Sequence, residues 1–211
     1  ETVAKTNPGD VDDLLGINLV GSDRTVQENL QDLVLSIGEN IKIRRFERRE
    51  GIIATYIHGN GTVGVMVQFD TDDATAAKDE FKAMGKDVAM QVAAMNPLYL
   101  DPASVPADVL DHEKGILLVQ MEEDPKMKGK PQQVLEGIVK GKLGKYYKEN
   151  CLTDQEFVKS TDHSSVSKYI ADTAKALGAD IKLTGYTRFA KGEGLEKKSE
   201  NFADEIKNMV K

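Results

Sequence analysis

Residues 36–69 decide the fold of this chain, and they read SIGENIKIRRFERREGIIATYIHGNGTVGVMVQF. A helix is expected to end at Gly38, because glycine tolerates the left-handed backbone that closes a helix. Alternation of apolar or β-branched residues with polar ones then predicts three strands: residues 41–49, 52–57 and 63–69. The pair Asn60-Gly61 favours a hairpin turn, since both residues tolerate a positive φ. The stretch predicts an antiparallel meander that presents a binding surface and holds no evident catalytic group.

Helices are predicted on both sides of this meander. Thr25 and Glu28 have the spacing of a capping box, which satisfies the free N–H groups at a helix start. The helix that follows carries an apolar stripe: Val26, Leu30, Leu33, Val34 and Ile37. After the meander, residues 71–96 predict one long helix whose apolar face covers the sheet. Residues 1–24 are acidic and broken by turns, and predict only a short helical piece at 11–15.

The charge changes sign in the middle of the chain. Residues 107–125 hold six acidic side chains and one lysine, whereas residues 126–148 hold seven lysines and one glutamate. Both segments carry apolar residues at helical spacing, and a break with two prolines separates them. We therefore predict an antiparallel helical hairpin whose acidic arm pairs with its basic arm, each ion pair contributing about 1 kcal/mol or less.

The last third of the chain returns to mixed structure. We expect a strand at residues 155–158, a helix at 165–177, a strand at 181–189, a turn at 192–194 and a terminal helix at 201–210. The whole order predicts an α+β fold, with two lobes of small antiparallel sheets packed with helices and an inserted antiparallel coiled-coil hairpin. The predicted parts are an N-terminal segment (1–24), an N-terminal core subdomain (25–104), the hairpin (105–148), a C-terminal core subdomain (149–198) and a C-terminal helix (199–211).

Composition excludes several classes of protein. The 211 residues carry a net charge of −7, which disfavours non-specific nucleic-acid binding. The single cysteine forbids an intrachain disulfide and fits a reducing compartment. No apolar run approaches the roughly 20 residues of a membrane span. We expect a protein of a reducing compartment that uses no membrane.

The sequence offers no catalytic constellation. Its three histidines are His58, His112 and His163, and none belongs to a metal-binding pattern. Cys151 has no histidine near it in sequence, so we predict a buried or incidental thiol. Motifs that mark a nucleophile are absent. The chain is therefore expected not to be an enzyme and to have no catalytic residue, metal or cofactor.

The glycine-rich turn at residues 58–64 invites a comparison with phosphate-binding loops. Such a loop follows a strand and opens a helix, whose N-terminus meets the anion. Here a strand is predicted after the glycines, which favours a hairpin turn. His58 is then either a turn residue or a contact for a partner, because turns on a rigid scaffold often carry function. The basic clusters near Phe46 and in residues 126–148 have a simple explanation as solvated surface, so no direct nucleic-acid binding is expected.

The order of short motifs resembles one known family. The motifs are Ile37-Gly38-Glu39-Asn40-Ile41, Arg44-Arg45, His58-Gly59, Val63-Gly64-Val65, Asp87-Val88-Ala89-Met90-Gln91-Val92-Ala93-Ala94 with Pro97, Lys130-Pro131, Gly141-Lys142, Leu152, Gln155, Phe157, Arg188-Phe189 and Gly192-Glu193-Gly194-Leu195-Glu196-Lys197. Together they resemble the core of bacterial elongation factor Ts over nearly the whole chain.

This resemblance implies a guanine-nucleotide exchange factor that binds the GTPase elongation factor Tu and promotes GDP release without covalent chemistry. It implies two α+β subdomains with a coiled-coil hairpin inserted in the second. It also implies that Ile37 and Gly38, and the turn of His58 and Gly59, contact the GTPase. Dimers occur in the family, and we expect a homodimer to use the C-terminal lobe. The resemblance also implies a protein of the bacterial cytoplasm, or alternatively of an organelle stroma or matrix.

Two features of the family are not found in the sequence. The N-terminal helical domain is missing, and the start Glu1-Thr2-Val3-Ala4-Lys5 is not the Thr-Asp-Phe-Val motif of the family. We expect a fragment or a processed product. The alternative function is a core that binds a GTPase, a ribosome or RNA without promoting exchange. A nucleotide-binding enzyme that uses the glycine turn is a third hypothesis.

Overall fold

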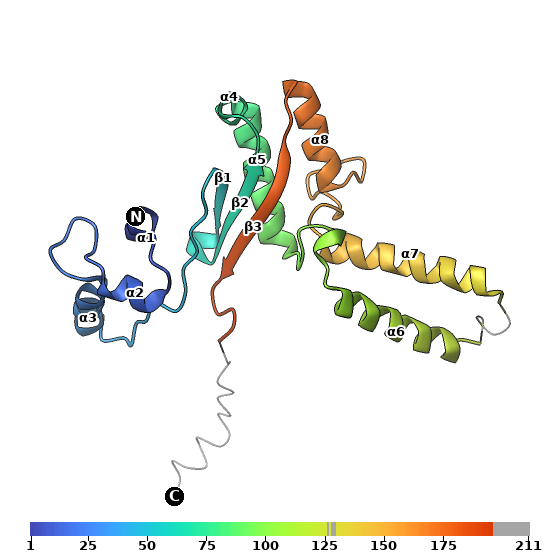
Figure 1. Ribbon diagram of the computed structural model, residues 1–211, viewed down its shortest axis with the longest axis horizontal. Helices are drawn as coiled ribbons and strands as arrows, with labels where there is room; N and C mark the ends of the chain where they lie inside the picture. Colours follow the sequence, from blue (N-terminus) through green and yellow to red (C-terminus); the bar gives the residue numbers. More distant parts are fainter. Residues whose placement is uncertain (126, 128–129, 196–211) are drawn as a thin grey trace, which may run out of the picture. The chain divides into compact units, whose positions relative to one another are not determined.

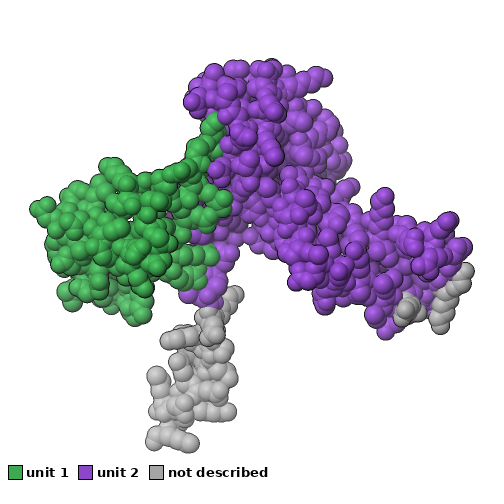
Figure 2. All heavy atoms as spheres, in the orientation of Figure 1, with its two compact units in different colours: residues 1–53 green, residues 54–211 purple. Residues whose placement is uncertain are grey.

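The structure is a computed structural model that describes residues 1–125, 127 and 130–195. It divides into two compact units, residues 1–53 and residues 54–211, which are coloured separately in Figure 2. Each unit is described by itself below. The predicted terminal helix at 201–210 lies outside the described residues.

Unit 1 contains three helices: α1 (Thr2–Thr6), α2 (Val11–Gly16) and α3 (Val26–Ile37). The predicted capping box is confirmed, because the Glu28 backbone N–H donates to Thr25 Oγ1 at 3.2 Å and the Thr25 N–H donates to Glu28 Oε2 at 2.8 Å. Gly38 closes α3 with a φ of 78°, as predicted. Local signals therefore place both ends of α3 correctly.

Replacing Thr25 by alanine should destabilise the first turn of α3 by about 1 kcal/mol, because two helix N–H interactions depend on this cap. Hydrogen exchange of the first-turn amides measures the effect locally. Thr25→Ser keeps the hydroxyl and serves as the control. Equal exchange rates in the alanine and serine variants would contradict the assigned role of the cap.

The strand predicted at residues 41–49 is wrong, since residues 40–50 have no regular secondary structure. Alternation and β-branching indicate only that a segment fits a pleated, half-buried surface, and a strand needs a pairing partner. Here the charged side chains are held locally instead. Arg48 pairs with Glu50 at 2.5 Å, and Arg49 pairs with Glu47 at 2.6 Å.

The sheet of the described residues has three strands in the order β1 (Ile52–His58), β2 (Val63–Asp70) and β3 (Lys182–Ala190). The 3-10 turn η1 (Gly59–Gly61) joins β1 to β2. Strands β2 and β3 are antiparallel, with Val63 opposite Ala190 and Asp70 opposite Lys182. This pairing corrects the prediction of two small sheets, because the strand assigned to the second lobe completes the first sheet.

The other predicted strand, at residues 155–158, is reduced to a single bridge between Glu156 and Ser165. Strands β2 and β3 are more than a hundred residues apart in the sequence, and one sequence does not reveal the register in which such distant strands pair. The α+β class is nevertheless confirmed by the mixture of helices with a small sheet.

The long helix predicted after the meander is two helices, α4 (Asp73–Ala76) and α5 (Asp79–Met95). Lys78 interrupts them with extended backbone, at φ −69° and ψ 143°. Helix α5 lies along one face of the sheet, and α8 (Val166–Leu177) packs beside it (Figure 1). Ser165 caps the start of α8, and Gly178 closes it in the left-handed conformation.

The core of unit 2 forms where α5 meets the sheet. Alternate residues of β2 are buried, as a strand with one covered face requires: Val65, Val67 and Phe69. The buried face of α5 contributes Phe81, Met84, Val88, Ala89 and Val92. The rings of Phe69 and Phe81 meet edge to face with centroids 5.4 Å apart.

The short turn η2 (Pro102–Ser104) leads to the helical hairpin, in which α6 (Ala107–Glu123) and α7 (Gln132–Asn150) lie side by side and run in opposite directions (Figure 1). Among the described side chains of α6 and α7, the predicted pairing of the two arms by charge is not found. Ion pairs among the described residues of the hairpin lie within a helix: Lys114–Asp111 at 3.2 Å and Lys145–Glu149 at 3.6 Å.

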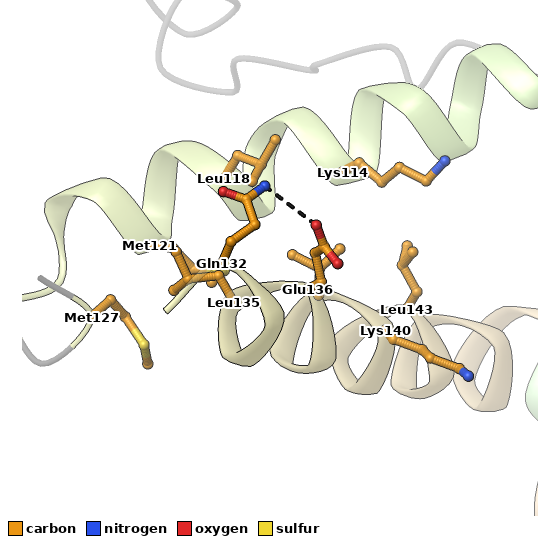
Figure 3. A pocket seen from close by; sticks show the side chains of 10 residues that line it. Lys114, Leu118, Met121, Met127, Gln132, Leu135, Glu136, Lys140 and Leu143 are labelled. Atoms are coloured by element: carbon orange, nitrogen blue, oxygen red, sulfur yellow. Dashed lines mark hydrogen bonds between the residues drawn. The ribbon is translucent and has the colours of Figure 1, made fainter. Parts of the chain in front are cut away.

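An apolar groove of about 780 Å³ lies between α6 and α7 (Figure 3). Its side chains come from both helices and from the connection: Leu118, Met121, Met127, Leu135, Val139 and Leu143, with Lys114, Gln132, Glu136 and Lys140 as polar members. Gln132 donates to Glu136 at 3.3 Å. Apolar contact therefore holds the hairpin together. Among the described residues, no ion pair joins the two helices.

None of the helices in the described ranges is long and apolar enough to span a membrane.

Candidate functional site

The glycine turn at the end of β1 is fixed by its own backbone. The carbonyl of His58 accepts hydrogen bonds from Thr62 N at 3.0 Å and from Thr62 Oγ1 at 3.1 Å. Gly59 has a φ of 55°, and a Cβ at this position would lie 2.4 Å from Thr62 Oγ1. Glycine is therefore required there by both conformation and space. The carbonyl of Thr62 in turn accepts from Lys191 N at 2.8 Å, just beyond β3.

The element after this turn is β2, as predicted. A phosphate loop would direct its backbone N–H groups at an anion from a helix N-terminus, and this turn leads into a strand instead. The geometry therefore fits a hairpin turn that presents side chains, and it does not fit a phosphate cradle.

His58 extends from this turn into solvent, and its side chain is held on one side. The hydroxyl of Tyr56 lies 2.9 Å from His58 Nδ1, and the two ring centroids are 5.9 Å apart. Tyr56 is half-buried, because alternation puts it on the same face of β1 as Ala54, which lies against Gly85 of α5. Ile57 projects to the opposite face and is 65% exposed.

Ile37 and Gly38 form the end of α3 in unit 1. Ile37 is 57% exposed, and the neighbouring Leu35 is 83% exposed. Leu33, which the helical stripe predicted to be inside, is also exposed. Exposed apolar side chains that gather on one element are typical of a surface that contacts another protein.

An apolar groove of about 680 Å³ lies beside this helix within unit 1. It is lined by apolar residues of α2, of α3 and of the segment after α3: Val11, Leu15, Leu30, Val34, Leu35, Ile41 and Ile43. These side chains include Leu30 and Val34 of the predicted apolar stripe. Unit 1 buries few large side chains, with Leu14 and Val26 as its buried apolar residues among those described.

The four predicted contact residues fall into two pairs. Ile37 and Gly38 are consecutive in unit 1, and His58 and Gly59 are consecutive in unit 2. Sequence analysis did not single out Tyr56, although its position two residues before His58 on a predicted strand places both on one face. Leu35 gave no signal, because it lies off the apolar stripe of α3.

The described residues contain no group of three or more His, Cys, Asp or Glu side chains that could hold a metal ion. Cys151 is fully buried, and burial raises the pKa of its thiol to about 11. A thiol with such a pKa remains protonated near neutral pH and is a poor nucleophile. The prediction of a buried thiol is confirmed.

Comparison with known proteins identifies clear relatives. The sequence model of the family described as Elongation factor TS matches residues 1–193. A protein named elongation factor Ts from Clostridium kluyveri is 45% identical over 190 residues, which are 89% of this chain and 60% of the relative. Relatives of the same name from Clostridium perfringens and Clostridium acetobutylicum are 42% and 40% identical over 99% and 98% of this chain. The chain spans 60%, 67% and 66% of the length of these three relatives.

Proposed function

The chain belongs to the elongation factor Ts family, and we propose that it is a guanine-nucleotide exchange factor that binds elongation factor Tu and promotes the release of GDP. The observation that carries this proposal is the family match over residues 1–193. The candidate contact residues support it, because they are exposed and either apolar or set on a rigid turn. Cys151, the side chain most able to act as a nucleophile, is buried and protonated.

An exchange factor of this kind works by binding alone. It binds the nucleotide-free GTPase more tightly than the GDP-bound form, and by linkage GDP and the factor weaken each other's binding to the same extent. A coupling of about 4 kcal/mol changes an affinity by roughly a thousandfold. Apolar side chains and backbone on a rigid edge supply differential contact of this size without any covalent step.

The proposed contacts are Ile37 and Gly38 on unit 1, and His58 and Gly59 on unit 2. Removal of Ile37 from water would stabilise a complex, since its side chain is more than half exposed in the free chain. Gly38 and Gly59 both have positive φ values, and glycine allows a partner to approach their backbone closely. His58 adds a polar side chain on a turn that Thr62 holds in one conformation.

The finer organisation is part of the same proposal. We expect the subdomain boundaries at residues 25–104, 105–148 and 149–198 to describe units of function, and α6 and α7 to pack as a coiled coil through their apolar groove. We also expect the protein to act in the bacterial cytoplasm, to form any homodimer through the C-terminal lobe, and to contact no nucleic acid directly.

The direct test is release of labelled GDP from elongation factor Tu. Adding the 211-residue chain, with unlabelled GDP in excess, should accelerate release at least about tenfold, since coupling between two ligands typically spans 5- to 150-fold. Binding is followed in parallel by calorimetry. Binding without faster release would replace the proposal by the alternative of a non-exchanging binding core, and the absence of both would exclude a functional complex.

Two variants of α3 make the same assay specific. Ile37→Ala should weaken the complex about tenfold, the effect of losing a well-packed apolar anchor. Leu35→Ala is the comparison, because it removes a more exposed apolar side chain two residues before Ile37 on the same helix. Equal losses in both variants would show general surface hydrophobicity instead of a defined contact at Ile37.

A further inference from the structure

The imidazole of His58 is engaged at one ring nitrogen and open at the other. Its Nδ1 lies 2.9 Å from the hydroxyl of Tyr56. No other group among the described residues bonds this side chain, so Nε2 faces solvent. The turn that carries this side chain is already held by the hydrogen bonds of Thr62 to the His58 carbonyl.

Tyr56 is well placed to hold that ring. It sits on β1 two residues before His58, on the face of the strand where Ala54 touches α5. Its ring is half-buried, whereas the imidazole is exposed. Tyr56 belongs to a strand of the sheet, and its hydroxyl provides a point from which to orient His58.

The direction of the hydrogen bond follows from chemistry. A neutral imidazole has one N–H donor and one acceptor nitrogen, and the bond made by one nitrogen selects the proton position on the other. A phenol ionises with a pKa of about 10 and is a good donor. The phenol is the more acidic of the two groups, so the favoured arrangement has the hydroxyl donating to Nδ1 and the ring proton on Nε2.

We propose that Tyr56 is a positioning residue for the contact made by His58: it holds the imidazole as the Nε2–H tautomer and directs that N–H outward, as a donor to an acceptor oxygen on the GTPase. The identity of the partner rests on the proposed function. The tautomer itself is a property of the free chain, so the two are tested separately.

The first arm of the test uses the chain alone. Nitrogen-15 spectra of the three histidine rings are recorded about one pH unit or more above the ordinary histidine pKa of about 6.5, where the rings are neutral. His58→Gln identifies the His58 signals. Wild-type protein should show His58 mainly as the Nε2–H tautomer, and Tyr56→Phe should shift it toward a mixture, while His112 and His163 stay unchanged.

The second arm measures GDP release from elongation factor Tu. Tyr56→Phe should slow the accelerated release about fivefold, which is the effect of losing one well-placed hydrogen bond. His58→Gln places an amide N–H near the Nε2 position and should retain most activity, whereas His58→Asn places it near Nδ1 and should lose it. Tyr56→Phe added to His58→Gln should cause no further loss, because Tyr56 acts through the imidazole.

Tyr147→Phe is the matched control, since it removes a tyrosine hydroxyl from α7, away from the turn, and should change neither readout. An unchanged tautomer in Tyr56→Phe, unchanged release in that variant, or equal activity of the glutamine and asparagine variants at 58 would overturn the inference. If wild-type protein fails to accelerate release, the proposed function fails, and the ring spectra still decide whether Tyr56 sets the tautomer.

Discussion

Replacement of Gln91 by leucine is expected to lower the free energy of unfolding of unit 2 by about 3 kcal/mol, because it breaks a fully buried hydrogen-bond network. Gln91 Nε2 donates to Gln155 Oε1 at 3.2 Å and to the Glu156 carbonyl at 3.1 Å, and Gln91 Oε1 accepts from Val158 N at 2.9 Å. Both glutamines have no exposed surface. Leucine fills a similar volume and leaves three polar groups without partners.

This network connects two parts of the fold that are distant in sequence. Gln91 belongs to α5, and its partners belong to the loop that leads from α7 to α8. Gln155 also donates to the Glu149 carbonyl at 3.0 Å, near the end of α7. One side chain of α5 therefore fixes the loop that carries the buried residues Leu152 and Phe157.

Urea unfolding followed by tyrosine fluorescence measures the effect, and it reports on unit 2 alone because the six tyrosines all lie beyond residue 53. Gln133→Leu, at an exposed position of α7, is the matched control and should change stability by less than about 0.5 kcal/mol. Adding Gln155→Leu to Gln91→Leu should cost less than the sum of the single changes, because the pair is coupled. Strict additivity, or a loss no larger than that of the control, would contradict the network.

Replacement of Gly85 by valine is expected to cost about 3 kcal/mol or to prevent folding of unit 2. A Cβ built at Gly85 lies 2.7 Å from the Cβ of Ala54 and 3.5 Å from Cε2 of Phe69. The first distance joins two atoms fixed by backbone, so α5 and β1 would have to move apart. Overpacking of this kind typically costs 1–3 kcal/mol, and the branched side chain adds a further clash.

The hairpin supplies the control for Gly85. Gly144 lies in the middle of α7, and no neighbouring atom lies within 4 Å of a Cβ built there. Gly144→Val therefore measures the intrinsic effect of valine in a helix, which should be neutral or slightly stabilising. Ala54→Gly combined with Gly85→Val should recover part of the loss. If both glycine variants behave alike in urea, close approach of α5 to β1 does not limit stability.

Sequence patterns identified the parts of this fold that depend on neighbouring residues. The capping box at Thr25, the glycine that closes α3 and the two helices of the hairpin all follow from contacts within a few residues. The break between α4 and α5 was missed. Asp72 caps the start of α4, where it accepts from Thr75 N at 2.8 Å, and Lys78 then leaves the helical conformation before α5 begins.

The errors concern pairing between distant segments. Residues 41–49 have the composition of a strand and lack a partner strand in the described structure. The strand predicted at residues 181–189 was assigned to a second sheet, and β3 instead pairs with β2 along the whole length of β2. The composition of a strand does not show which strand it pairs with. The register between strands more than a hundred residues apart is set by the assembled core.

In the candidate site, too, the features set by neighbouring residues were predicted and those set by distant contacts were not. The turn of His58 and Gly59 was identified from local chemistry, and the strand after it correctly argued against a phosphate loop. Its link to Tyr56 appeared only when the distance between the side chains was known. Gln91 and Gly85 gave no signal as structural residues, because their roles depend on partners that lie more than thirty positions away along the chain.

Because Cys151 is buried, the native protein does not react with thiol reagents. It is the single cysteine of the chain, it has no exposed surface, and its thiol stays protonated near neutral pH. A reagent that reacts with thiolates gains access only when the surrounding core opens. The rate at which Cys151 is labelled therefore measures the opening of the region that Gln91 holds together. An engineered cysteine on the surface could likewise carry a fluorophore without removal of the native one.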